Sequence, residues 1–181
     1  MRAVVQRVTS AAVTVDGETV SQIGRGLMVL VGIGVDDNDT DIVALTKKIL
    51  TLRVFEDLND PGKMWKSSVK DINGEILCVS QFTLLANTTK GNKPDFHRAM
   101  PSGASNTMYS LFLNKLKQQY GDEKIKDGRF GAMMNVSLTN DGPVTFTLDS
   151  RKFEYVDRAE SSSRGAPKAT EERTVPTSTV V

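Results

Sequence analysis

Residues 79–86 read VSQFTLLA and continue the apolar run EILCV of residues 75–79. The whole run predicts a buried strand, yet Ser80, Gln81 and Thr83 place two hydroxyls and an amide inside it. Buried polar groups need hydrogen-bond partners, so three of them within four residues indicate more than local packing. In a continuous strand Gln81 and Thr83 would share one face. A strand that instead ended at Ser80 would leave its terminal N–H groups facing a ligand.

The segments around this strand predict a compact α/β domain. Alternating apolar residues predict paired strands over residues 2–8 and 11–15, and the continuous apolar run at residues 27–34 suits a central strand. Two segments change to helical spacing, one beginning near Asp39 and the other near Ser102. Without any internal repeat, this pattern predicts a single compact α/β domain with largely antiparallel sheets and two main helices.

The composition of the C-terminal segment sets a domain boundary. Residues 157–181 are rich in Ser, Thr, Pro and mixed charge and contain no aromatic residue. Such a segment cannot bury enough apolar surface to offset the entropy lost on ordering it. We therefore expect a folded domain over residues 1–156 followed by a mobile tail. An RNA-contacting or partner-binding arm is the alternative, although glutamates nearly cancel its basic residues.

Composition excludes several classes of site. The chain has 181 residues, a net charge of +1, one cysteine and one histidine. A lone Cys78 forbids an internal disulfide, and one Cys with one His is too few for the usual zinc site, so we expect no metal and no cofactor. The balanced charge predicts no strong attraction of the whole surface to nucleic acid. No apolar run approaches about 18 residues, which predicts no membrane span and a cytoplasmic protein.

Ser80 and His97 form one candidate catalytic pair. A serine esterase would use Ser80 as the nucleophile and His97 as the base. His97 lies in a polar loop beside Arg98, however, and its nearest carboxylate is Asp95. That setting is more typical of a surface or phosphate-contacting group. No G-x-S-x-G, HExxH, Walker or dinucleotide-binding motif supports another common class of enzyme.

A second polar stretch, TNDGPVT, spans residues 139–145. Asn-Asp-Gly-Pro is ordinary turn sequence and predicts a hairpin loop between strands at residues 133–138 and 144–148. An X-Pro bond is also the kind of peptide bond that can be cis. In that form the carbonyls of Gly142 and Pro143 would be held rigidly at a ligand, as a stereochemical filter requires.

These stretches together resemble the D-aminoacyl-tRNA deacylase family, the D-Tyr-tRNA deacylases. The segments that carry the resemblance are, in order along the chain, MRAVVQRV (1–8), VSQFTL (79–84), KGNKPDF (90–96), RFGAMMNVSL (129–138) and NDGPVT (140–145). Two separated hexapeptides with matching flanks are far more specific than a single motif. The resemblance covers residues 1–150 and leaves out only the tail.

The resemblance implies a three-layer fold (β/β/α) and a homodimer whose site is shared across the interface. Members of the family hydrolyse the ester between a D-amino acid, or glycine, and the terminal ribose of tRNA, which is a proofreading step of translation. Residues 80–83 are implied to line the pocket. The bond matching Gly142-Pro143 is cis in the family and reaches into the other subunit's pocket, with Arg7 and Met134 close to it.

The same resemblance implies RNA-assisted hydrolysis, in which the 2′-hydroxyl of the terminal ribose takes part. Backbone N–H groups near Phe82 and Thr83 would then act as an oxyanion hole, while Ser80 and Gln81 would position the ester or the terminal adenosine. Thr83 is the alternative candidate, as a protein nucleophile. Basic residues of the 90–98 loop would meet phosphates of the acceptor end or stay solvated. A non-catalytic tRNA-binding module is a further alternative.

Overall fold

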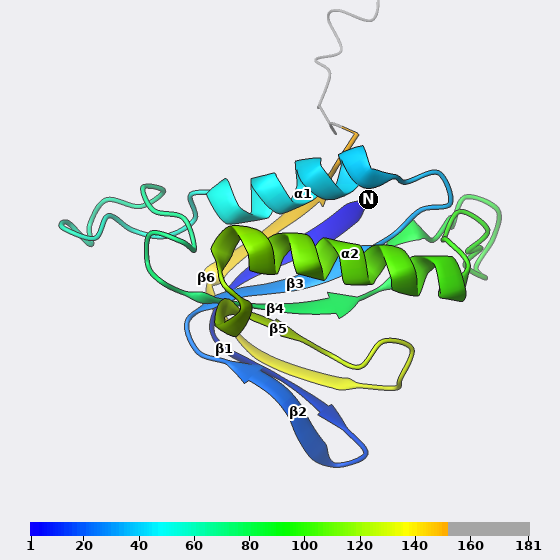
Figure 1. The fold of residues 1–181 in the computed structure, drawn as a ribbon, viewed down its shortest axis with the longest axis horizontal. Coiled ribbons are helices and arrows are strands. Elements are labelled where there is room, and N and C mark those ends of the chain that lie inside the picture. Colours follow the sequence, from blue (N-terminus) through cyan, green and yellow to red (C-terminus); the bar gives the residue numbers. More distant parts are fainter. Residues whose placement is uncertain (152–181) are drawn as a thin grey trace, which may run out of the picture.

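The computed structural model describes residues 1–151. The predicted tail at residues 157–181 and the end of the predicted domain, 152–156, lie outside the described residues, so the boundary stays a prediction. The described part forms two main helices and a six-stranded sheet (Figure 1), which confirms the predicted α/β class. Within residues 1–151, no helix combines the length and the apolar character that a membrane crossing would need.

One long strand, β1 (Arg2–Val15), organises the sheet. Its first half pairs with β3 (Gly26–Gly32) and its second half with β2 (Glu18–Ile23), both in antiparallel orientation. Along its other edge, β1 pairs antiparallel with β6 (Asn135–Asp149) over nearly its whole length. The backbone of β1 is therefore hydrogen-bonded on both sides, and the other strands take their positions from it.

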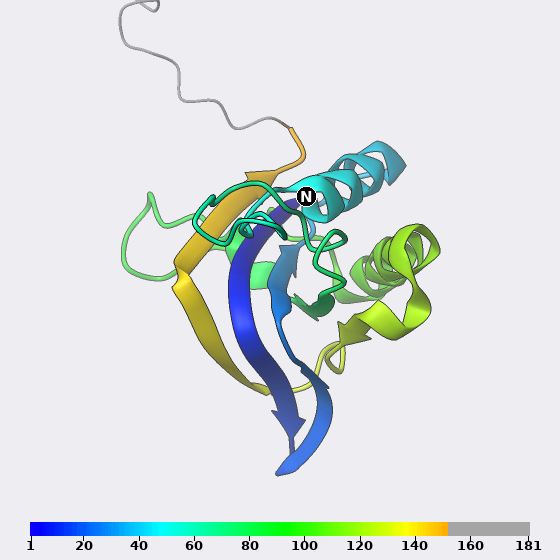
Figure 2. The same ribbon diagram turned by 90° about the vertical axis from the view of Figure 1, so that its left-hand side faces the viewer.

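The prediction of two paired strands at residues 2–8 and 11–15 was wrong, because both belong to β1. Thr9 and Ser10, which lie between them, are exposed but remain extended. The register with β6 shifts on both sides of Val8, and the two strands curve strongly in this region (Figure 2). Polar residues at a bend interrupt the apolar alternation in the same way that a turn would.

Two shorter strands extend the sheet beyond β3. β4 (Glu75–Ser80) runs parallel to β3, and β5 (Ile125–Asp127) runs parallel to β4. The sheet is thus antiparallel around β1 and parallel at its other side. β4 contains the buried run predicted from EILCV, including Cys78, which has no exposed surface. Burial raises the pKa of the Cys78 thiol, as expected for a structural cysteine.

The sheet curls until β2 contacts β4 and β5, so two apolar clusters form. One cluster fills the inside of the curled sheet and contains Val8, Val13, Ile23, Leu77 and Val79 among others. The other lies between the sheet and the helices α1 (Asp39–Thr51) and α2 (Ser102–Tyr120), which cover one face (Figures 1 and 2). Two sheet layers and one helix layer are the arrangement that the family resemblance implies.

The helix predicted near Asp39 begins at that residue. The Asn38 side chain accepts a hydrogen bond from Thr40 N–H at 2.9 Å, and the Asp41 carboxylate accepts one from Asn38 N–H at 3.0 Å. This reciprocal capping satisfies N–H groups that have no partner inside the helix.

The predicted hairpin at residues 139–143 is not formed. Val8 pairs with Asn140 and Gln6 pairs with Thr145, so one residue of β1 stands opposite four residues of β6. These four residues bulge out of the ladder, and β6 then continues in the same direction. Asn-Asp-Gly-Pro suits a bulge as well as a turn. The pairing of β6 with β1 favours the bulge over the turn, because both halves of β6 lie along β1.

Candidate active site

A cavity of about 620 Å³ opens beside the carboxyl ends of β3 and β4. Ser80, Gln81 and Phe82 line it where β4 ends. The opposite walls are mainly apolar and include Phe96, Met100, Phe130 and Met134. An apolar cavity with a few polar groups at one side is typical of small-ligand sites. Four residues predicted for the site, Ser80, Gln81, Phe82 and Met134, therefore come together.

The buried strand ends at Ser80 and does not continue to residue 86. Gln81 N–H still donates to the Val31 carbonyl at 2.7 Å, and the chain then turns into a short 3₁₀ helix, η1 (Phe82–Leu85). The first two N–H groups of η1, on Phe82 and Thr83, have no acceptor within residues 1–151. Of the two geometries considered for this sequence, the chain adopts the one that frees backbone donors.

Gly32 allows η1 to lie against β3. A Cβ atom at this position would be 2.5 Å from Leu85 Cδ2 and 2.9 Å from Leu84 Cβ. Side chains do not approach that closely, so any other residue would push η1 outward. The position of the Phe82 and Thr83 donors thus depends on a glycine about fifty residues earlier in the chain.

Thr83 is exposed and does not line the cavity. Its hydroxyl accepts a hydrogen bond from the Gln81 side-chain amide at 2.5 Å. In the described structure no His, Asp or Glu side chain hydrogen-bonds to this hydroxyl, so nothing there serves as a base to activate it. Phe82 is 57% exposed and packs edge-on against Phe96, with ring centroids 5.0 Å apart.

The structure does not bring His97 to Ser80. His97 Nδ1 lies 2.5 Å from Asp95 Oδ2, and both side chains are largely exposed. His97 does not line the cavity that Ser80 lines. The geometry of a Ser80/His97 esterase, which needs the serine hydroxyl and the imidazole within hydrogen-bonding distance, is therefore not present.

The bulge of β6 carries Gly142 and Pro143, whose connecting peptide bond is cis. Arg7 is the β1 residue opposite the bulge, and its side chain is buried. Arg7 Nη1 donates to the Val54 carbonyl at 2.6 Å. Arg7 Nε lies 2.9 Å from Asp141 Oδ2, close enough for an ion pair but without the alignment of a hydrogen bond. The Arg7 guanidinium therefore lies directly against the base of the bulge.

Gly142 and Pro143 are exposed, and neither lines the cavity of their own chain. A single chain thus holds the predicted site in two separate places. Met134, which the resemblance placed near the Gly-Pro element, lines the cavity wall, where its Sδ accepts a weak hydrogen bond from Arg129 N–H at 3.3 Å.

A partly buried polar pair that the sequence analysis missed supports the cavity wall. The Tyr109 hydroxyl donates to Asp127 Oδ1 at 2.6 Å, and the Tyr109 ring packs against Phe130. Burial raises the pKa of the Asp127 carboxyl above its ordinary value of 3.8, while the Tyr109 hydrogen bond opposes that rise. The pKa of Tyr109 is raised as well, chiefly by burial. No sequence signal links the two residues, because α2 and β5 meet only in the fold.

Metal ligands do not gather in the described structure. Residues 1–151 contain no group of three or more His, Cys, Asp or Glu side chains placed to hold a metal ion. What this site offers chemically is backbone N–H donors, side-chain hydroxyls and amides, and an apolar wall.

Comparison with known proteins identifies relatives of the chain. Residues 4–149 match the family described as D-Tyr-tRNA(Tyr) deacylase. The D-aminoacyl-tRNA deacylase of Kluyveromyces lactis is 54% identical over 151 residues, which are 83% of this chain and 99% of the relative. Human D-aminoacyl-tRNA deacylase 1 is 55% identical over 150 residues, covering 83% of this chain and 70% of the relative.

A solved structure shows the same fold. The c-Myc DNA unwinding element binding protein is 55% identical and superimposes with a TM-score of 0.79, covering 82% of this chain and 98% of its own. The described fold therefore corresponds to nearly the whole of that structure.

The Asp127 carboxyl gives a testable pH dependence. Because its pKa is higher in the folded protein, folding favours the protonated form, and this contribution to stability is lost as pH rises from 3.8 through the folded pKa. Asp127→Asn keeps an acceptor for Tyr109 but does not ionise. We expect the free energy of unfolding of the wild type, relative to Asp127→Asn, to decrease as pH rises from about 3.5 to 7, measured by urea denaturation.

Tyr109→Phe provides the matched control. It removes the hydrogen bond that lowers the Asp127 pKa, so the decrease should extend to higher pH. A wild-type stability that stays at a constant offset from Asp127→Asn across this pH range would contradict the buried-carboxyl explanation.

Proposed function

This chain belongs to the D-Tyr-tRNA(Tyr) deacylase family, and we propose that its cavity binds the aminoacyl ester of D-aminoacyl-tRNA. The protein is a D-aminoacyl-tRNA deacylase, a hydrolase that cleaves this carboxylic ester and releases tRNA and the D-amino acid. The observation that carries the placement is the end of β4 at Ser80, which leaves the N–H groups of Phe82 and Thr83 without acceptors directly after the residues that line an apolar cavity. The cytoplasmic location predicted from composition is part of the same proposal.

The discrimination of handedness is assigned to the backbone of Gly142 and Pro143. An enzyme that accepts many D-amino acids cannot rely on a shaped side-chain pocket, where one methylene is worth only about 1–3 kcal/mol. With the ammonium and ester groups fixed, changing the configuration at Cα from D to L exchanges the positions of the hydrogen and the side chain. Carbonyl oxygens beside Cα leave room only for the hydrogen. Glycine has hydrogen on both sides, so glycyl-tRNA also passes this filter.

A filter of this kind has to be rigid, and contacts around the bulge supply rigidity. Asn140 Nδ2 donates to the Arg7 carbonyl at 2.8 Å and to the Val144 carbonyl at 3.1 Å, which closes the bulge on itself. The Arg7 guanidinium packs against Gly142, whose φ of 115° suits glycine. These contacts leave the Gly142 and Pro143 backbone little freedom to retreat from a ligand.

The working unit is proposed to be a homodimer that shares each site between two chains. Gly142 and Pro143 are exposed and do not line the cavity of their own chain, so a second chain has to present them if they act on the bound ester. Within residues 1–151, β6 pairs only with β1 and has a free edge. Trp65 is 52% exposed and lies edge-on to Phe146 of β6, which adds apolar surface of the kind that interfaces bury.

Hydrolysis is proposed to be RNA-assisted. Within residues 1–151 no side chain is placed as a base for Thr83, and Ser80 and His97 do not form a pair. Water therefore attacks the ester carbonyl with the help of the 2′-hydroxyl of the terminal ribose, which accepts a proton from the water and passes its own proton to the departing 3′ oxygen. The N–H groups of Phe82 and Thr83 stabilise the oxyanion, and such a donor is worth about 10²–10³ in rate. Ser80 and Gln81 orient the ester or the terminal adenosine, and Met134 forms the opposite wall.

Paired D- and L-tyrosyl-tRNA test the filter. We expect the D-substrate to be hydrolysed at least about 100-fold faster, because a side chain forced against fixed carbonyls costs about 3 kcal/mol. Glycyl-tRNA should be cleaved as well. Release of radiolabelled amino acid measures all three rates. Comparable cleavage of the L-substrate would contradict the filter, and binding of uncharged tRNA without any release would favour a non-catalytic module.

The role of the ribose has its own test. Replacing the 2′-hydroxyl by hydrogen on a D-tyrosyl-tRNA charged at the 3′ position should lower kcat by at least about 100-fold, since no side chain of residues 1–151 is placed to replace it. Single-turnover rates with saturating enzyme isolate the chemical step. Undiminished turnover would assign the nucleophile to the protein, and a Thr83→Val variant would then identify it if it alone abolished activity.

A further inference from the structure

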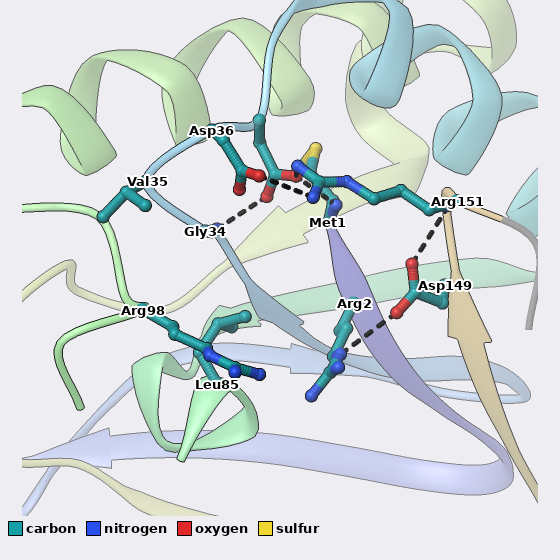
Figure 3. Close-up of a pocket in the computed structure, with 10 residues that line it drawn as sticks. Met1, Arg2, Gly34, Val35, Asp36, Leu85, Arg98, Asp149 and Arg151 are labelled. Carbon is teal, nitrogen blue, oxygen red and sulfur yellow. Dashed lines mark hydrogen bonds and ion pairs between the residues drawn. The ribbon is translucent and has the colours of Figure 1, made fainter. Parts of the chain in front are cut away.

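A second cavity, of about 270 Å³, is lined by residues from the start of β1, the end of β6 and the loops before α1 and α2 (Figure 3). Leu85, the last residue of η1, forms part of its wall. Most of its other lining residues are charged. The charged side chains are Arg2, Arg98, Arg151, Asp36, Asp37 and Asp149.

The carboxylates of this cavity are already neutralised by cations. Arg151 binds Asp36 at 2.7 Å and Asp37 at 3.1 Å. Arg2 Nε binds Asp149 at 3.0 Å. Each aspartate therefore has an arginine partner, and none remains to bind a cationic ligand.

Two guanidinium groups, by contrast, have unused donors. Within residues 1–151, the Arg98 side chain makes no hydrogen bond or ion pair, and Arg2 Nη2 has no acceptor. The Arg98 and Arg2 side chains end on the same side of the cavity, next to Leu85 (Figure 3). The Arg98 backbone is fixed, because its carbonyl accepts a hydrogen bond from Val35 N–H at 3.0 Å.

A hydrogen bond also connects this cavity to η1, the short helix that follows the ester site. Arg2 Nη1 donates to the Leu84 carbonyl of η1 at 3.2 Å. The four residues of η1 extend over roughly 8 Å, which matches about two stacked nucleotide steps of roughly 3.4 Å. A strand whose last nucleotide sits at Gln81 and Phe82 can therefore pass over η1 and present a phosphate to the arginines.

We propose that this cavity binds a backbone phosphodiester of the tRNA acceptor end, with Arg98 and Arg2 as the donors. Guanidinium groups suit phosphate because their planar arrays of N–H donors can bind two oxygens at once. The inference rests on the proposed function, since the ester site fixes which part of the strand reaches the arginines. Arg98 makes no contact with the ester and serves to bind and position the strand.

The test compares substrates with and without backbone phosphates. D-tyrosyl-tRNA carries them, whereas adenosine esterified with D-tyrosine at the ribose has none. We expect Arg98→Gln to raise KM about fivefold for the tRNA substrate, as for loss of one solvent-accessible ion pair. KM for the adenosine ester should change less than twofold. The slope of log KM against log salt for the tRNA substrate should become shallower by about 0.7.

Arg53→Gln is the matched control. Arg53 is an exposed arginine beyond the C-terminal end of α1, whereas Asp36 and Asp37 precede its N-terminal end. A helix of 13 residues separates them, which is about 20 Å. This variant makes the same change of charge, and KM should change less than twofold for both substrates. An equal effect of the two substitutions on tRNA would mean general electrostatic attraction and would overturn the site.

Other outcomes also decide the proposal. An unchanged KM for tRNA, or an equal rise for both substrates, would overturn it. Inhibition of the wild type by millimolar inorganic phosphate, with tRNA kinetics unaffected by Arg98→Gln, would indicate a site for free anions and would also overturn it. Affinity for uncharged tRNA, measured by fluorescence anisotropy, should fall about fivefold in Arg98→Gln. This binding measurement tests the phosphate site even if neither ester is cleaved. Absence of cleavage would contradict the proposed function and not the phosphate site.

Discussion

The buried guanidinium of Arg7 is the interaction on which the candidate site most depends. The β1/β6 ladder is the longest pairing in the described part of the fold, and the larger of its two irregularities lies opposite this residue. A buried arginine is costly unless its donors are matched, and the Val54 carbonyl and the Asp141 carboxylate lie within reach of it. Removing Arg7 would leave both groups without their partner. The Arg7 side chain therefore fixes the position of the bulge in the sheet.

The two halves of the site arise from the same physical device, the interruption of a strand. Where β6 bulges, carbonyls of Gly142 and Pro143 leave the ladder and become available as acceptors. Where β4 ends at Ser80, N–H groups of Phe82 and Thr83 become available as donors. Backbone groups have no rotamers, so both sets are preorganised. An ester hydrolase that accepts many amino-acid side chains needs both: acceptors that face the hydrogen on Cα, and donors that stabilise the oxyanion.

Local patterns in the sequence predicted the helices and strands better than the contacts between them. The helical spacing that begins near Asp39 and the apolar run EILCV were sufficient to predict α1 and the buried part of β4, because such patterns are formed by neighbouring residues. The hairpin at residues 139–143 failed since turns and bulges use the same residues. The Tyr109–Asp127 pair and the Arg2–Arg98 cavity were invisible, because each joins elements that only the fold brings together. The family resemblance, and not residue spacing, pointed to Arg7.

The central claim is that backbone carbonyls of one chain select the configuration of the amino acid bound in the cavity of a second chain. A crystal structure of the protein with a non-hydrolysable D-tyrosyl-adenosine analogue tests it most directly. The account predicts a dimer in which the Gly142 and Pro143 carbonyl oxygens of one chain lie within about 4 Å of the ligand Cα in the other chain's cavity. A ligand enclosed by a single chain, with both carbonyls facing solvent, would contradict it.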